Sequence, residues 1–465
     1  MMVKSENLIM FFLVVLVMPG LYFGSGIPLY LLIVFLALLS LKNKNFNPVN
    51  IFFILLFILP YSLNRTILNM NIGNYLDNSF IASFPLYFYL FSKYKSIFSN
   101  RKLSRVMYYA VIVLVTSNLI PGLLSLIGYG HAVRFTEFLN YFNSILVGLI
   151  AYSTFKDAIS FQKFSILIVR LGLIVSIGGL VQYIIGFRIF SDGSFYQFAR
   201  LTIIPYPDPV DLFPFFIVPL SFAISEYNYR RTSFSLITIL SISLAGLLTW
   251  SRGGIITIII VIILGIIMHW RKNGIKIIVL FASILLMLSL TQDYIGKNMN
   301  FHYDRLYNSS NLAARVMLWD KTIKAIADSP ILGVGLGRGP EIVNSAAYSE
   351  GLASQYFYDY DITSGSKNTQ TLHSFFLNWI LSMGITIIPL IMIIYWKTIS
   401  IFWNQYKYSR NMSMKAFASS AMISIIGLTF FYLQNTSTSY YYLFFFLGTA
   451  YSMAEGNAKL SKEGL

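Results

Sequence analysis

Two arginines and a histidine are the residues of this chain best suited to chemistry on an anion. Arg252 lies between two strongly apolar runs, Arg315 lies within the longest stretch that is not hydrophobic, 291–371, and His373 closes that stretch. A guanidinium group binds phosphate through two parallel hydrogen bonds, and a histidine can accept a proton near neutral pH. The combination predicts a site that binds an anionic substrate and moves a proton.

The motif Ser251-Arg252-Gly253-Gly254 is the sharpest local feature. A charge inside or at the edge of a membrane is costly and is usually retained for a partner or a function. A helix starting at Gly253 would present free N–H groups and its positive dipole end, with Ser251 as a cap. The motif therefore fits an anion site, and it fits equally well a snorkelling arginine at a short outer turn.

Arg315 is expected on a helix over about 311–328, capped by Ser310 or Asn311 and ended by Pro330. The apolar positions recur at intervals of three and four, which predicts a helix lying on the protein or the membrane surface. These positions are Leu312, Val316, Trp319, Ile323 and Ile326.

Trp319 is four residues after Arg315 and therefore its neighbour on the helix surface. Its ring could support the guanidinium or stack on a sugar. The alternative is a core tryptophan beside a solvated arginine.

Alternating glycines follow in the segment 333–339, which also contains Arg338. Glycines at this spacing allow close backbone approach and unusual dihedral angles. The segment lacks the Gly-Lys-Ser/Thr ending of a phosphate loop and the strand that precedes one. We therefore interpret it as a tight turn after the helix.

The composition does not favour a metal site or a catalytic thiolate. The chain has no cysteine and four histidines, and it has no acidic pair at metal-ligand spacing. His373 falls at the start of an apolar run, where it could be a general base or a packing residue. We expect no metal and no cofactor.

The elements that must position these residues are apolar helices. Of the 465 residues, 56% are hydrophobic and 11% are charged, which is typical of an integral membrane protein. The net charge of +16 could indicate nucleic-acid binding, but cytoplasmic loops rich in Lys and Arg explain it better. We expect an all-α polytopic membrane protein, with residues 1–465 forming a single membrane domain.

About 12 to 14 transmembrane helices are expected, because several of the apolar runs are short. The runs are 8–24, 26–41, 49–63, 79–92, 106–127, 136–155, 164–186, 209–226, 234–250, 253–270, 275–290, 374–400, 415–433 and 438–453.

Lys and Arg residues gather in alternate loops, which predicts that both termini are cytoplasmic. The same alternation places the segment 291–373 outside as one long extracytoplasmic loop. Five chemically capable residues then share the outer face: Arg200, Arg252, Arg315, Arg338 and His373.

The chain resembles the superfamily of O-antigen ligases and Wzy-type O-antigen polymerases, and four segments carry the resemblance. They are Phe198-Ala199-Arg200 with Pro207-Asp208-Pro209, then Ser251-Arg252-Gly253-Gly254, then Ala314-Arg315 to Trp319 with Pro330-Ile331-Leu332-Gly333-Val334-Gly335, and His373-Ser374 with Gly384.

The resemblance implies a metal-independent, inverting membrane glycosyltransferase with a GT-C-like architecture. Its donor would be an undecaprenyl-diphosphate-linked oligosaccharide, with a chain-length regulator and a flippase as partner proteins. The catalytic residues would be His373, Arg252 and Arg315. Binding of the diphosphate or glycan would involve Arg200, Ser251, Gly253, Gly254, Trp319 and Arg338. The location would be a bacterial inner membrane, with the active site on the periplasmic face.

Departures from the family pattern favour a polymerase of surface polysaccharide repeats over a ligase. Ile387 and Ser382 replace a small and an acidic residue, and Pro-Asp-Pro near Asp208 replaces Pro-Asn. The tyrosine-rich segment 348–360 could line a sugar path. A flippase for lipid-linked oligosaccharides is the alternative from another class, and a cell-wall transglycosylase is a weaker one.

Overall fold

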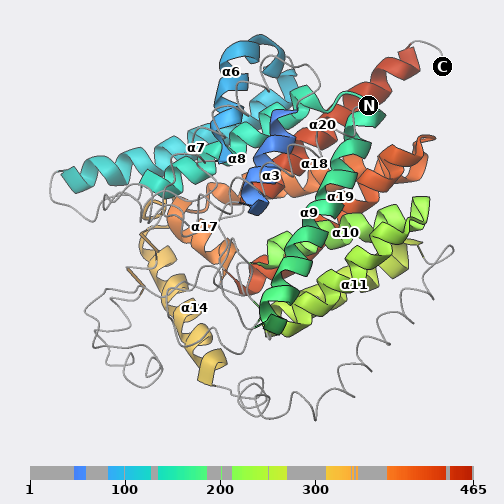
Figure 1. Ribbon diagram of the computed structural model, residues 1–465. Coiled ribbons are helices and arrows are strands. Elements are labelled where there is room, and N and C mark those ends of the chain that lie inside the picture. Colours follow the sequence, from blue (N-terminus) through green and yellow to red (C-terminus); the bar gives the residue numbers. More distant parts are fainter. Residues whose placement is uncertain are drawn as a thin grey trace, which may run out of the picture.

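The computed structural model describes residues 47–58, 82–98, 100–126, 135–185, 201, 212–249, 251–269, 310–336, 338–339, 342–343, 374–435 and 440–462. Within these ranges the regular structure is entirely helical (Figure 1). The helices are α3 (Pro48–Ile58), α6 (Phe84–Ile97), α7 (Arg101–Leu126), α8 (Phe135–Thr154), α9 (Ala158–Ile185), α10 (Phe213–Arg230), α11 (Ser233–Leu248), the helix Arg252–His269, α14 (Ser310–Asp328), α17 (Phe375–Met383), α18 (Ile387–Tyr408), α19 (Met412–Gln434) and α20 (Tyr440–Lys462).

By length and hydropathy, four of the described helices could cross a membrane. They are α9, the helix Arg252–His269, α18 and α19. The shorter α3 and α11 are also apolar. The prediction of an all-α polytopic membrane protein is confirmed. The number of 12 to 14 spans stays a prediction, since the runs 8–24, 26–41 and 275–290 lie outside the described residues.

Three helices near the centre give the bundle two distinct ends. At one end the start of α10 meets the start of the helix Arg252–His269, because the Phe213 ring fills the space beside Gly254. At the other end the Tyr229 ring lies edge-on to His269, with centroids 5.4 Å apart. These two helices therefore run in the same direction.

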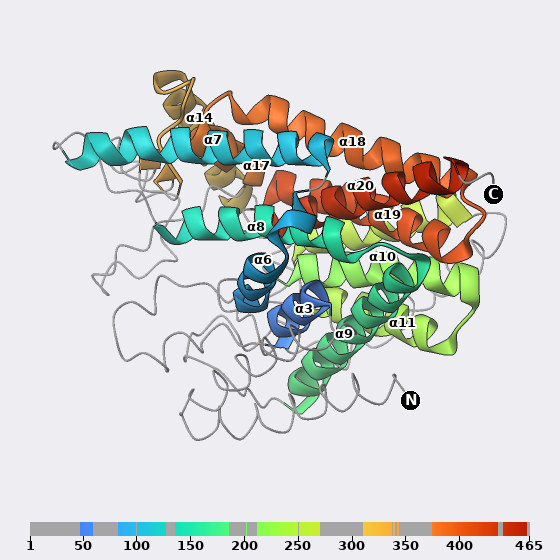
Figure 2. The same ribbon diagram turned by 90° about the horizontal axis from the view of Figure 1, so that it is seen from above.

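Helix α19 runs in the opposite direction. Ser413 at its start accepts a 2.9 Å hydrogen bond from Arg230 at the end of α10, and the Phe431 ring near its end lies 5.9 Å from Phe213. The arginine motif that begins at Arg252 and the C-terminus of α19 therefore share one end of the bundle. In Figure 2 the long helices α7, α8, α18 and α20 run side by side.

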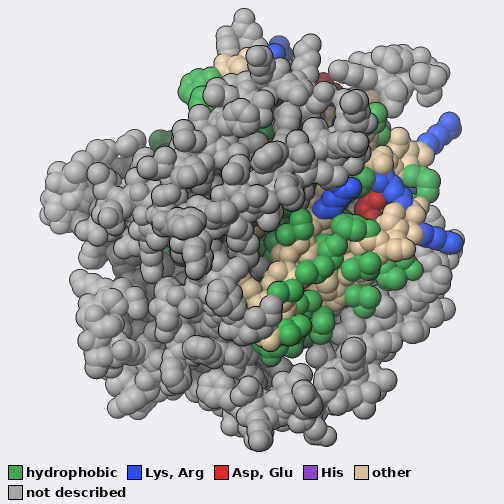
Figure 3. Space-filling model, viewed as in Figure 1, with side chains coloured by type: hydrophobic (Ala, Val, Ile, Leu, Met, Phe, Trp, Pro, Cys, Tyr) green, Lys and Arg blue, Asp and Glu red, His purple; other side chains and the backbone are tan. Residues whose placement is uncertain are grey.

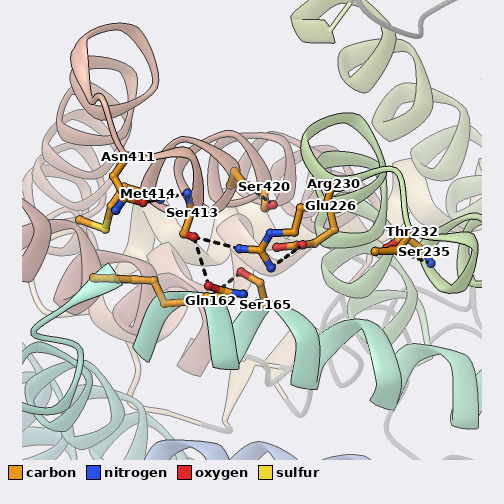
Figure 4. A network of polar contacts seen from close by, with 12 residues as sticks. Gln162, Ser165, Glu226, Arg230, Thr232, Ser235, Asn411, Ser413, Met414 and Ser420 are labelled. Atoms are coloured by element: carbon orange, nitrogen blue, oxygen red, sulfur yellow. Dashed lines mark hydrogen bonds and ion pairs between the residues drawn. The ribbon is translucent and has the colours of Figure 1, made fainter. Parts of the chain in front are cut away.

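Basic residues mark the opposite end, where a polar network joins three helices (Figure 4). Arg230 forms a 3.0 Å ion pair with Glu226, and Ser413 donates a 3.4 Å hydrogen bond to Gln162 of α9. Figure 3 shows Lys and Arg side chains gathered at one end of a hydrophobic face. The alternation of basic loops across the membrane stays a prediction.

The apolar run 374–400 is two helices rather than the single span expected from hydropathy. Helix α17 ends at Met383, and Gly384 takes φ 69° and ψ −172°, a conformation essentially restricted to glycine. Helix α18 then starts at Ile387. Hydropathy misses the break because apolar residues flank Gly384 on both sides.

The glycine segment after α14 docks on this break. The N–H groups of Val334 and Gly335 donate 2.9 Å hydrogen bonds to the carbonyls of Leu381 and Ser382, and the Ile385 N–H donates a 2.7 Å bond to the Pro330 carbonyl. Gly333 and Gly335 both have positive φ, at 69° and 92°. The turn therefore locks α14 to α17, and the prediction of a tight turn is confirmed.

The substitution Gly384→Ala should destabilise the protein. A Cβ at this position would lie 2.1 Å from the Ile331 carbonyl oxygen, in addition to the unfavourable φ. We expect a loss of about 1–3 kcal/mol or more, measured as a lower melting temperature of the detergent-solubilised protein. Gly178→Ala in α9 is the matched control, because nothing lies within 4 Å of its added Cβ. Equal melting temperatures for the two variants would contradict this account of the turn.

Candidate functional site

The helix Arg252–His269 begins at the arginine motif. The Ser251 carbonyl accepts a 2.8 Å hydrogen bond from the Ile255 N–H, which makes Ser251 the residue before the first turn. Gly254 is needed for packing, since a Cβ there would lie 1.8 Å from the Phe213 ring. Packing therefore gives a structural reason for the small size of Gly254, and its substrate-binding role stays a prediction.

Gly253 faces the C-terminus of α19 instead. A Cβ at Gly253 would lie 2.8 Å from Oε1 of Gln434 and 3.2 Å from Nδ2 of Asn435. Two side-chain amides therefore lie directly against the first turn of the helix that carries Arg252. The small size of Gly253 is what allows them to come this close.

Arg315 lies on α14, which spans Ser310–Asp328 and confirms the helix predicted over 311–328. Of the predicted apolar face, Val316 and Ile323 are 54% and 58% exposed, as on a helix whose apolar side is not covered by protein. The face that packs on protein carries Leu318 and Thr322, which are both 0% exposed. It faces α17 because the glycine turn holds α14 there, which sequence periodicity does not show.

The Arg315 guanidinium reaches the end of α19, where its Nη1 donates a 3.4 Å hydrogen bond to the Gln434 carbonyl. Burial, followed by the positive charge of Arg252, lowers the pKa of Arg315 below the ordinary value for arginine. The predicted pair of Arg252 and Arg315, separated by more than sixty positions in sequence, is therefore close enough to interact. A bound anion would offset both effects on Arg315, because an opposite charge stabilises the charged guanidinium.

Helix α17 presents its N-terminus to the same end of the bundle. Its cap is Ser374, whose hydroxyl accepts a 3.5 Å hydrogen bond from the Leu377 N–H, so the helix begins at Phe375 rather than at His373. The Phe375 N–H donates a 3.1 Å hydrogen bond to the Asn435 carbonyl. His373 itself lies outside the described residues and directly precedes this cap in the sequence.

The remaining predicted residues have different positions. Arg200 lies outside the described residues, while the next residue, Leu201, donates a 2.9 Å backbone hydrogen bond to Leu248 at the end of α11. Arg338 is buried in the glycine turn, where its Nη1 donates a 3.1 Å hydrogen bond to the Val334 carbonyl. Trp319 is half-buried on α14.

Gln434 and Asn435 were not predicted from the sequence. They contact Gly253, Arg315 and Phe375, which come from three separate segments of the chain. The available signal was the polar sequence Gln-Asn-Thr-Ser-Thr-Ser at 434–439 between two apolar runs. A polar loop between spans is ordinary, so the signal could not single out these two residues.

The described part of this end therefore combines two guanidinium groups with the N-termini of two helices. Helix N-termini carry unpaired N–H groups and a positive dipole end, and both favour an anion. Among the described residues, no group of three or more His, Asp or Glu residues could hold a metal ion. The geometry suits a ligand with more than one negative charge.

The helical fold is that of a multi-pass membrane protein, and a family match indicates a glycosyltransferase-like membrane enzyme. Residues 236–391 match a family described as O-antigen ligase, and this segment includes the arginine motif, α14, the glycine turn and α17. The match confirms the resemblance to the superfamily of O-antigen ligases and Wzy-type polymerases. A comparison with curated proteins gave no match.

Inorganic diphosphate should stabilise the full-length protein in detergent, because it would lie near two guanidinium groups of like charge. A ligand at 100 times its Kd adds about 2.7 kcal/mol to the free energy of unfolding. We expect a rise of a few degrees in melting temperature for the wild type and none for Arg252→Gln or Arg315→Gln. Arg105→Gln, an exposed arginine on α7, should respond like the wild type. An unchanged response in both site variants would show that the anion binds elsewhere.

Proposed function

We propose that this protein polymerises lipid-linked oligosaccharide repeat units of a surface polysaccharide such as O-antigen or capsule. The donor is a glycan carried on undecaprenyl diphosphate, and the acceptor is a sugar hydroxyl of a second glycan. The observation that supports this proposal best is that Gln434 contacts both Arg315 and Gly253, the residue after Arg252, beside the starts of two helices. The match to the O-antigen ligase family supports the same class of reaction.

The leaving group explains the need for clustered positive charge. When the acceptor oxygen bonds to the anomeric carbon, the bond from that carbon to the diphosphate oxygen breaks, and undecaprenyl diphosphate leaves with the bonding electrons. The charge that develops on this oxygen is stabilised by guanidinium groups and helix N-termini. The energy comes from the glycosyl diphosphate bond, so the reaction needs neither ATP nor a metal.

The proton of the acceptor hydroxyl goes to His373 in this proposal. Ser374 caps α17 at the end of the bundle that carries Arg252, and His373 directly precedes Ser374 in the sequence. A base at this position can accept the proton as the oxygen attacks the anomeric carbon from the face opposite the diphosphate. The configuration at that carbon is then inverted.

A ligase that transfers the glycan to lipid A-core uses the same donor and differs in the acceptor. The departures at Ser382 and Ile387 favour the polymerase, and both residues are buried at the α17–α18 break. A flippase is the candidate from another class. Loss of a polymerase leaves single lipid-linked repeats on the outer face of the membrane, whereas loss of a flippase leaves them on the inner face.

The site is proposed to face the periplasm from a bacterial inner membrane, with both termini in the cytoplasm. The end of the bundle at Arg230 carries the basic loops, and Arg252 lies at the other end. The positive-inside rule then assigns the Arg230 end to the cytoplasm. A chain-length regulator and a flippase are the proposed partner proteins.

Labelling of single cysteines tests this orientation, because the chain has no cysteine of its own. Lys324→Cys on α14 and Lys407→Cys near the end of α18 replace exposed residues at opposite ends of the bundle. A membrane-impermeant maleimide should label Lys324→Cys in intact spheroplasts and label Lys407→Cys only after permeabilisation. The reverse pattern would place the site in the cytoplasm and remove the proposed donor.

Variants of the site should separate donor binding from transfer in a purified, metal-free assay. Arg252→Ala and Arg315→Ala should lower transfer about 10²- to 10³-fold, because each removes a donor to the developing charge. His373→Ala should lower transfer by about 10²- to 10⁴-fold while donor binding persists, because the arginines remain. The wild-type rate should fall toward acid pH as the imidazole is protonated.

Exposed Arg105→Ala is the control for these variants, and all are compared at equal amounts in the membrane. Wild-type transfer by both arginine variants would refute the anion site. Loss of donor binding in His373→Ala would instead make His373 a diphosphate ligand or a packing residue.

A further inference from the structure

We propose that Gln434 and Asn435 are positioning residues that fix the relative positions of three parts of the proposed active site. This inference rests on the proposed function, since the parts are the first turn of the helix Arg252–His269, the Arg315 side chain and the cap of α17. The two residues lie beyond the segment 236–391 that matches the O-antigen ligase family. They are supplied by the C-terminus of α19.

Gln434 acts on the arginines with two separate groups. Its backbone carbonyl accepts the hydrogen bond from Arg315, so the negative end of the α19 dipole fixes this guanidinium. Its side-chain Oε1 lies against Gly253, the residue after Arg252. One residue therefore sets the separation between the two arginines that the diphosphate must bridge.

Asn435 connects the arginine motif to the cap of α17. It is 2% exposed, and its Nδ2 donates a 3.3 Å hydrogen bond to the Phe431 carbonyl in the last turn of α19. Its side chain borders Gly253, and its own carbonyl accepts the hydrogen bond from the Phe375 N–H. A shift of Asn435 would therefore move the start of α17, and the residues that precede it, relative to Arg252.

Helix α19 is held at both ends, so residues at its C-terminus can fix the positions of these parts. The helix is 23 residues long, its other end is held by Ser413 against Arg230, and Phe431 is wedged beside Phe213. Asn435 follows in an extended conformation, with φ −141° and ψ 147°. Gln434 and Asn435 are therefore anchored in the packed bundle by α19.

The first test compares Asn435→Ala with Asn228→Ala. Asn228 is an equally buried asparagine, 3% exposed, whose Nδ2 donates a 2.8 Å hydrogen bond to the carbonyl four residues earlier, at the opposite end of the bundle. Both variants lose the same kind of bond. Asn435→Ala should lower the maximal transfer rate roughly 10- to 100-fold, as a small misplacement of reacting groups does. Binding of undecaprenyl diphosphate should change less than about threefold.

Asn228→Ala should keep the wild-type transfer rate even where its melting temperature falls as far as that of Asn435→Ala. Equal transfer rates for the two variants at equal amounts of folded protein would overturn the role of Asn435. Loss of undecaprenyl diphosphate binding in Asn435→Ala would also overturn it, because the residue would then act on binding rather than on alignment.

The second test replaces the side-chain amide of Gln434 with a carboxylate. In Gln434→Glu the new charge would lie beside Gly253 and near Arg315, where it competes with the diphosphate for the arginines. The apparent KM for the donor should rise on the order of tenfold, and undecaprenyl diphosphate should bind correspondingly more weakly. Gln405→Glu, a buried glutamine on α18 that bonds to the Met453 carbonyl, is the matched control and should leave the KM unchanged.

These experiments separate the inference from the proposed function. If the wild type neither binds undecaprenyl diphosphate nor transfers glycan, the proposed function fails. If the wild type does both and Arg252→Ala does not, while the variants of Gln434 and Asn435 behave like their controls, only the positioning role fails.

Discussion

The candidate site depends on holding two positive charges at one end of the bundle. Burial, followed by the positive charge of Arg252, disfavours the charged form of Arg315. Perturbed groups of this kind gather at functional sites, where a ligand of opposite charge stabilises them. The surrounding bundle must therefore hold the arginines rigidly, since repulsion alone would separate them.

That rigidity comes from packing contacts between helices and from the glycine turn. The Phe213 ring fills the space beside Gly254, the end of α19 holds Gly253 and Arg315, and the glycine turn at Gly333 locks α14 onto α17. Each contact requires a residue without a side chain at a place where two segments meet. The glycines near the arginines therefore allow close packing of the helices that carry the candidate site.

The two ends of the bundle use their charged residues differently. The end at Arg230 holds its charge in an ion pair with Glu226 and in hydrogen bonds to serine and glutamine, so its charges stabilise the fold. The end at Arg252 brings like charges together, which costs stability and would favour an anionic ligand.

The sequence by itself determined the fold class, the helix that carries Arg315 and the turn around Gly333. Hydrophobic run length, helix-stopping residues and the cost of charge near a membrane are local properties, and they can be read from neighbouring residues. It could not show the break at Gly384, the exposure of Val316 or the meeting of Gln434 with Arg315. The tertiary structure decided these, because each depends on contacts between segments that are far apart in the chain and that hydropathy leaves equivalent.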